Sequence, residues 1–313
     1  MSFLQKGELY GEEFMEKKYF QSFTVRPISS VSSDAIVDAY NRGEIDEEDV
    51  TLTDFMYMCS MCSEDQILRY AEFKGISNAT GRLKRLCNRY ILTSFYLSTE
   101  KNERLEMMGD RAECFYCIQG GAVSLLSVAT DRYDLVWDIK SLTGLGKRVR
   151  INCLRAEFFM RCMTMGKYRA EFEKNPIYVV YPSGVPRVFS AFGCVGFDMR
   201  NEKFEYIIVD SVSKNMLSDR NRDRLLCYPS FLRKSFWKKY LWRCEGEPVL
   251  LLFVDNDDMA FEISHAFMET SRDFDAVMFT TPDRITDTTT TEPFLKYDKM
   301  SDTLYSCNYF LFN

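Results

Sequence analysis

Three successive stretches in the first half of the chain carry apolar residues at the spacing of an α-helix. The first, "LTDFMYMCSMC" at residues 52–62, has Thr51 or Thr53 available as its N-cap. The second, "SEDQILRYAEF" at residues 63–73, opens with Ser63 and carries Gln66 three residues later, which is the pattern of a capping box. A third helix is predicted to begin near Ser77.

The third predicted helix has two distinct faces. Its apolar face is formed by residues at i, i+3, i+4 and i+7, namely Leu83, Leu86, Cys87 and Tyr90. A different face carries polar and basic residues, namely Asn78, Arg82, Arg85 and Arg89. The pattern predicts that the first set packs on a core while the second faces outward.

After the third helix the period changes to that of β-strands. The runs "ILTSFYLST" (91–99) and "AECFYCI" (112–118) are rich in β-branched and aromatic residues, and the charged stretch 100–111 joins them as in a hairpin. Three helices followed by a hairpin is the order of a winged helix-turn-helix. We assign this domain to residues 44–130, after an N-terminal arm (1–43) with weak secondary structure.

The second half of the chain alternates predicted strands and helices. A helix follows at 122–129, and a longer basic helix from Gly146 to about Met165 connects the halves (131–170). The expected strands are "IYVVYP", "RVFSAFGCVGFDM", "FEYIIVDSV", "PVLLLFV", "DAVMFTT" and "YSCNYFLF", with helical segments at 219–242 and 257–272 and an exposed Thr-rich loop in "TDTTTTEPF". Residues 171–313 are therefore predicted to form an α/β domain with a mixed sheet, and the whole chain to be α+β.

Composition limits the chemistry. The single histidine, His265, excludes two-histidine zinc sites, and its apolar-spaced surroundings favour a structural role. Eleven cysteines without an export segment fit reduced thiols, so we expect a cytoplasmic protein that does not insert into a membrane. The pairs "CSMC" (59–62) and "CFYC" (114–117) are too far apart for a zinc ribbon, so we expect core cysteines, with neither a metal nor a cofactor.

The basic face of the third helix is the main candidate for function. The chain has a net charge of -6, yet no acidic residue occurs between Phe73 and Thr99. In a helix-turn-helix, the recognition helix offers such side chains to the major groove. We expect Asn78, Arg82, Lys84, Arg85 and Arg89 to contact double-stranded DNA. The wholly acidic stretch 44–65 should lie away from DNA or pair with a basic partner, for which the helix 147–169 is the nearest candidate.

Two carboxylates in the second half of the chain are candidate metal ligands of a nuclease site. Restriction-type nucleases hold Mg²⁺ with an aspartate on one strand and an acidic-x-Lys pair on the next. Here Asp198 precedes a turn and Asp210 ends a buried strand, but Val212 stands where the lysine is expected. The motif is half present, which favours a restriction-endonuclease-like fold that has lost cleavage.

The layout resembles the replication-relaxation family of plasmid and integrative-element proteins. The resemblance rests on the winged-helix order ending in "FYCIQGGAVSLL", on the long basic helix, and on "GFDM", "YIIVDSVS", "RLLCYPSFL" and "PVLLLFV". It implies a DNA-binding winged helix joined to a nuclease-like domain, in proteins of plasmid replication, mobilisation or relaxosome assembly. Ile208 stands where the family has a companion acid, and Tyr90 where many winged helices have glycine.

We therefore expect a sequence-specific DNA-binding accessory protein of a mobile element, without catalysis. Its candidate partners besides DNA are a second copy of the chain and a relaxase or other mobile-element protein. The alternatives are a Mg²⁺-dependent DNA nuclease using Asp198 and Asp210, with Lys214 as the basic partner, and a transcriptional repressor with a ligand-sensing second domain.

Overall fold

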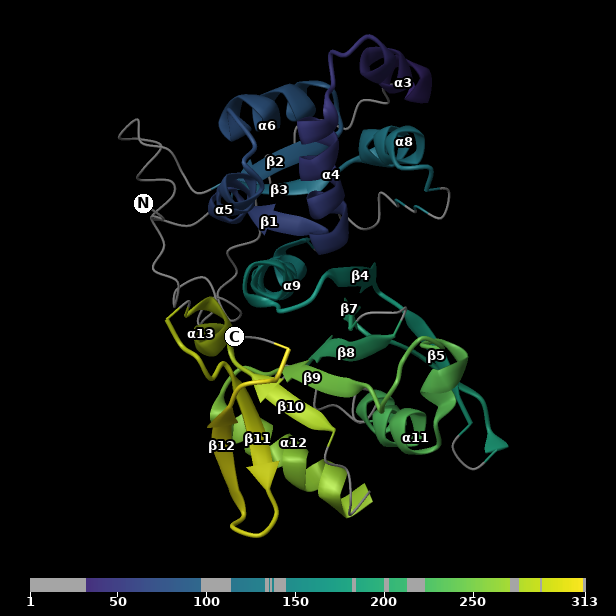
Figure 1. Cartoon of the computed structure of the whole chain (residues 1–313), viewed down its shortest axis with the longest axis vertical. Helices are drawn as coiled ribbons and strands as arrows, with labels where there is room; N and C mark the ends of the chain where they lie inside the picture. Colours follow the sequence, from purple (N-terminus) through teal and green to yellow (C-terminus); the bar gives the residue numbers. More distant parts are fainter. Residues whose placement is uncertain are drawn as a thin grey trace. The chain divides into compact units, whose positions relative to one another are not determined.

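The computed structural model divides the chain into two compact units, residues 1–160 and 161–313, each with its own β-sheet (Figure 1). The boundary falls within helix α9 (Leu145–Met165). The structure describes residues 32–96, 114–132, 135, 137, 145–181, 184–199, 203–212, 223–270, 276–287 and 289–311. The expected α+β class with a mixed sheet is confirmed.

Unit 1 combines helices with a three-stranded antiparallel sheet. Its further elements are α3 (Ser33–Asn41), α4 (Glu47–Cys59), β1 (Met61–Ser63), α5 (Glu64–Lys74), α6 (Ala79–Asn88), β2 (Leu92–Tyr96), β3 (Cys114–Ile118) and α8 (Gly120–Ala129). The strands lie in the order β1-β3-β2. Helix α3 falls within the arm that was expected to have weak secondary structure, so that expectation is wrong for residues 33–41.

The helix starts were predicted with mixed success. Ser63 caps α5 and forms a capping box with Gln66, as predicted. The prediction for α4 was wrong, because Asp46 is its N-cap and closes a capping box with Asp49, while Thr51 and Thr53 lie inside the helix. Acids suit this end of a helix, where backbone N–H groups lack partners and the helix dipole is positive.

The predicted hairpin is confirmed as the antiparallel pair β2 and β3, in which Thr93 lies opposite Cys117. Strand β1 was not predicted. Helix α4 ends at Cys59, where Ser60 adopts a left-handed conformation (φ 67°), and the next three residues pair with β3. The expected wing tip at 100–111 lies outside the described residues.

The predicted apolar face of α6 is confirmed for two of its four residues, whereas Cys87 and Tyr90 are half-buried and Tyr90 lies beyond the end of the helix. Leu83 and Leu86 are both fully buried. At the end of α6, Tyr90 has φ 56°, and Ile91 N–H donates to the Leu86 carbonyl at 3.0 Å. This backbone turn directs the chain into β2. Glycine adopts such a conformation most easily.

Unit 2 is built on a seven-stranded mixed sheet in the order β12-β11-β10-β9-β8-β7-β4. The strands are β4 (Ala170–Lys174), β7 (Gly193–Asp198), β8 (Phe204–Ser211), β9 (Val249–Phe253), β10 (Val277–Thr280), β11 (Phe294–Asp298) and β12 (Thr303–Cys307). Strands β8, β9 and β10 are parallel to one another, and the other neighbours are antiparallel. The apolar strands β8 and β9 lie in the interior of this sheet. Strands β4 and β11 were missed.

One face of this sheet is covered by the segments that connect its strands. These are α11 (Cys227–Arg233), the 3-10 helix η4 (Phe236–Lys239), α12 (Asp257–Thr270) and the hairpin of β5 (Ile177–Val180) with β6 (Arg187–Ser190). Phe231 of α11, Ile263 of α12 and Phe189 of β6 share a core with Leu250 and Leu252 of β9.

Buried arginine stabilises one end of unit 2. Arg161 donates to the carbonyls of Asp287 (3.1 Å) and Thr290 (2.7 Å), and so holds the Thr-rich loop between α13 (Pro282–Thr286) and β11. His265 is half-exposed, and its Nε2 lies 3.0 Å from Asp302 Oδ1. Within the described residues, no helix has the length and apolar composition required to span a bilayer.

The two faces of α6 allow a matched stability test. Leu86→Ala should lower the free energy of unfolding of unit 1 by about 2–5 kcal/mol, because it opens a cavity beneath the helix. Lys84→Ala, on the exposed face of the same helix, should change it by no more than about 0.5 kcal/mol. The free energies of unfolding of both variants are measured by urea titration, in which the opening of unit 1 is monitored by hydrogen exchange of its peptides. Equal losses of stability in the two variants would contradict the assignment of Leu86 to the buried face of α6 and of Lys84 to its exposed face.

Candidate nucleic-acid interface

Helix α6 presents its polar face next to the acidic start of α4. Asn78 precedes the helix in a left-handed conformation (φ 48°) and is exposed, as is Lys84. The three arginines of this face all turn toward carboxylates of residues 44–49. The structure therefore brings together two charged segments that the sequence separates by about 30 residues.

Arg82 makes the most contacts. Its Nη1 lies 2.6 Å from Asp46 Oδ1 and 3.0 Å from Asp49 Oδ1, and its Nη2 lies 2.5 Å from Glu48 Oε2. Its Nε donates to the Ser77 carbonyl at 2.9 Å. With all these donors engaged and only 9% of the residue exposed, Arg82 acts as a structural tie between α4 and α6.

Arg85 and Arg89 continue the pairing along α6. Arg85 Nη2 lies 2.6 Å from Oδ2 of the fully buried Asp49, and Arg89 Nη2 lies 2.6 Å from Glu44 Oε2. These two arginine side chains keep 38% and 31% of their surface exposed. We name Glu44, Asp46, Glu48 and Asp49 with Arg82, Arg85 and Arg89 the α4–α6 charge cluster.

In the α4–α6 charge cluster, hydrogen bonds favour the ionised forms of Glu44 and Asp46. Hydrogen bonds from Arg42 and Arg89 lower the pKa of Glu44 to about 2. Desolvation raises the pKa of Asp46, but hydrogen bonds from Arg82 and from the Asp49 backbone outweigh it, so the net shift is downward. Both of these carboxylates are therefore ionised at neutral pH.

The partner expected for the acidic segment was wrong. The helix 147–169 was the candidate, yet Glu44, Asp46, Glu48 and Asp49 pair with arginines of α6 and its C-cap. Helix α9 instead contributes an acid of its own, because Glu157 is paired with Arg69 of α5 and accepts a hydrogen bond from Gln66 at 2.9 Å. The basic face of α6 was expected to meet DNA, so its pairing with these acids was not predicted.

The outward surface of α6 still carries polar and basic groups. A shallow hollow is lined by Gly81, Lys84, Arg85, Asn88 and Arg89. Lys84 forms no ion pair within the described part of the chain, and Asn78 and Asn88 are exposed. Of the five residues predicted to contact DNA, Asn78 and Lys84 are fully accessible, Arg85 and Arg89 are shared with carboxylates, and Arg82 is nearly covered.

The two carboxylates of the nuclease alternative lie at opposite ends of the sheet in unit 2. Asp198 of β7 is opposite Phe204, and Asp210 lies six residues further along β8. At about 3.4 Å per residue, the two positions are about 20 Å apart, so they do not share a metal ion. Lys214, the proposed basic partner, lies outside the described residues.

Asp210 is instead the centre of a buried hydrogen-bond network. Its Oδ2 accepts from Arg224 and, at 2.7 Å, from the Tyr228 hydroxyl, while Oδ1 accepts from Ser211 N–H at 2.8 Å. Burial, and then the nearby Asp210 charge, raise the pKa of Tyr228, which keeps its hydroxyl a donor. Sequence reasoning placed Asp210 at a strand end but missed both partners.

The cysteine pairs behave as core residues. Cys59, Cys62 and Cys117 are buried, and burial raises the pKa of Cys117 to about 12 and that of Cys62 well above its usual value. Burial therefore favours the neutral form of these thiols. Among the described residues, no group of three or more His, Cys, Asp or Glu side chains is arranged to hold a metal ion.

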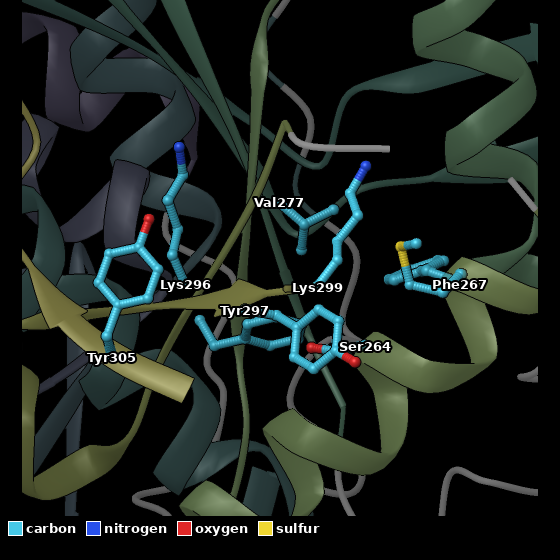
Figure 2. Close-up of a pocket in the computed structure, with 9 residues that line it drawn as sticks. Ser264, Phe267, Val277, Lys296, Tyr297, Lys299 and Tyr305 are labelled. Carbon is cyan, nitrogen blue, oxygen red and sulfur yellow. The ribbon is translucent and has the colours of Figure 1, made fainter. Parts of the chain in front are cut away.

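A separate cavity of about 290 Å³ lies in unit 2 between α12 and the strands β10 to β12. Buried Phe267, Val277 and Phe279 supply apolar walls, and Lys296 and Lys299 supply charge. Figure 2 shows the two lysine side chains extending in the same direction. Its size is at the lower end of the range for small-molecule sites.

No protein-family model, curated protein or solved structure matches this chain. Any assignment of function therefore rests on the geometry of these two units and on their charges.

The α4–α6 charge cluster makes Arg82 a stability residue. Arg82→Ala should lower the free energy of unfolding of unit 1 by about 1.5–3 kcal/mol, because it removes charge-assisted hydrogen bonds around the buried Asp49. Arg89→Ala, whose single partner Glu44 is exposed, should cost no more than about 1 kcal/mol. Hydrogen exchange under urea measures the difference. An Arg82→Ala protein as stable as the parent would refute the structural role.

Asp210 can be tested against Asp198 in the same way. Asp210→Ala should lower the free energy of unfolding of unit 2 by about 3–5 kcal/mol, because it removes the ion pair with the partly buried Arg224 and leaves the buried Tyr228 hydroxyl without its acceptor. Asp198→Ala should cost much less, since that side chain is only half-buried. Urea unfolding is the measurement, paired with plasmid nicking in Mg²⁺ or Mn²⁺. Unchanged stability with abolished nicking would identify Asp210 as catalytic.

Proposed function

We propose that unit 1 is a winged helix-turn-helix that binds double-stranded DNA. The observation that carries the proposal is the chain order α4–β1–α5–α6–β2–β3 together with the sheet order β1-β3-β2. In that arrangement α6 takes the place of the recognition helix, and β2 and β3 form the wing. The acid-free stretch around α6 supports this role.

The charge cluster changes which side chains would reach DNA. Lys84, Asn78 and Asn88 are exposed on the outer side of α6 and are suited to phosphate and base-edge contacts. Arg85 and Arg89 keep part of their surface free, so they add positive potential while remaining tied to Asp49 and Glu44. Arg82 orients α6 and does not contact DNA.

We propose a supporting, non-catalytic role for unit 2. The strand order β4-β7-β8-β9, with β7 antiparallel and β9 parallel to β8, is compatible with a restriction-endonuclease-like core. The separation of Asp198 from Asp210 and the complete pairing of Asp210 favour a fold without cleavage. The whole protein would then be a DNA-binding accessory factor of a plasmid or conjugative element, acting in replication, mobilisation or relaxosome assembly.

The cavity in unit 2 favours one second candidate, a transcriptional repressor whose second domain senses a ligand. Its two lysines and apolar walls would suit a small organic anion. The two candidates differ in one respect that can be measured. In a repressor, a small molecule bound in unit 2 changes the DNA affinity of the protein, whereas an accessory factor responds to a protein partner.

The DNA-binding proposal is tested by selecting sites from a randomised duplex library and measuring affinity against salt. The full-length protein should enrich a defined site, and Lys84→Ala should reduce the slope of log affinity against log salt by about 0.9, the value of one phosphate contact. Lys203→Ala removes one exposed lysine from unit 2 and should leave the slope unchanged. The proposal would be refuted if the parent protein enriched no site and bound duplex DNA no more tightly than the Lys84→Ala variant.

A further inference from the structure

A second basic surface lies in unit 2, between α11 and β9. The stretch 233–243 reads "RKSFWKKYLWR", with five basic residues and no acid. It includes helix η4 and the turn that follows it. We name Lys234, Lys238, Lys239 and Trp242 the lysine–tryptophan surface. All four residues are exposed, and Trp242 retains 76% of its surface.

The geometry of η4 explains why these side chains point outward. A 3-10 helix has three residues per turn, so residues three apart lie on the same side. Trp237 and Tyr240 form the inward side, because Trp237 is buried and Tyr240 packs against the core of unit 2. Lys238 and Lys239 therefore occupy the remaining, outer sides, and their ammonium groups lie 5.5 and 5.6 Å from the rings of Trp237 and Tyr240.

Nearby acids do not neutralise this surface. Glu171 pairs with Arg243 at 2.8 Å, and Glu245 pairs with Lys203. Within the described residues, Lys234, Lys238 and Lys239 form no ion pair. In contrast to the arginines of α6, these three cations keep their charge available to a partner.

We propose that the lysine–tryptophan surface binds single-stranded DNA. Three lysines supply phosphate contacts, and an exposed indole supplies a stacking platform. Stacking on Trp242 requires a base whose face is uncovered, which a single strand provides and a duplex does not. An anionic membrane fits less well, because such surfaces bind through an amphipathic helix with a broad apolar face, and η4 is only one short turn.

The choice of DNA over RNA rests on the proposed function of unit 1, but the surface is separate from α6. Separation of strands accompanies both replication and mobilisation of a plasmid, so a protein that holds duplex through α6 and single strand through unit 2 would keep an opened region near its site. Binding at one surface can then be abolished while binding at the other is kept, which makes the two proposals separable.

The experiment measures binding of the full-length protein to labelled dT20, to the dT20·dA20 duplex and to rU20 by fluorescence anisotropy. The parent should bind dT20, and tryptophan fluorescence should be quenched on binding. Trp242→Ala should weaken dT20 affinity by about 5- to 150-fold, whereas Trp242→Tyr keeps most of it. Lys238→Ala with Lys239→Ala should reduce the salt slope by about 1.4, the value of two single-strand phosphate contacts.

Matched controls separate this surface from general charge and from α6. Lys167→Ala removes an exposed lysine elsewhere in unit 2 and should leave the dT20 salt slope unchanged. Lys84→Ala should leave dT20 binding unchanged while weakening duplex binding. Unchanged dT20 affinity in Trp242→Ala, tighter binding of rU20 than of dT20, or binding only to phosphatidylserine vesicles would each overturn the proposal.

Discussion

The buried carboxylate of Asp49 is the constraint on which unit 1 depends. An ionised group with no exposed surface is costly unless cations and hydrogen bonds surround it. Two arginines of α6 meet this requirement, and the Asp46–Asp49 capping box fixes the carboxylate at the first turn of α4. The position of α6 is therefore set by charge pairing as well as by the burial of Leu83 and Leu86.

Unit 2 uses the same device at a different place. Asp210 lies one residue before the end of β8, and it is met by Arg224 from the segment before α11 and by Tyr228 from α11 itself. The strand end and the helix that follows it are thereby tied together around one buried charge. In each unit a buried carboxylate accepts hydrogen bonds from several protein donors and so ties two elements of the fold together.

Local features of this fold were predictable, and features that depend on distant pairing were not. Ser63 and Gln66 identified the start of α5 because a capping box involves only neighbouring residues. The runs of β8 and β9 were recognisable because strands buried on both faces are continuously apolar. Strand β4, whose exposure alternates and which pairs with the distant β7, has no comparable pattern.

The candidate interface shows the same limit more sharply. Periodicity placed Arg82, Arg85 and Arg89 on one face of α6, and that placement agrees with the burial of Leu83 and Leu86. Periodicity could not show what faces them, because the acids lie in a separate helix.

One clue was present: a stretch with acids only (44–65) precedes a stretch with bases only (74–99). When acids and bases occupy separate stretches of a sequence, a fold that places the two stretches together lowers the free energy. Unit 1 has this arrangement. In unit 2, Lys234, Lys238 and Lys239 are exposed and form no ion pair within the described residues, so their charge remains at the surface. The sign and pairing of charge thus distinguish a basic segment that holds the fold together from one that is available to a partner.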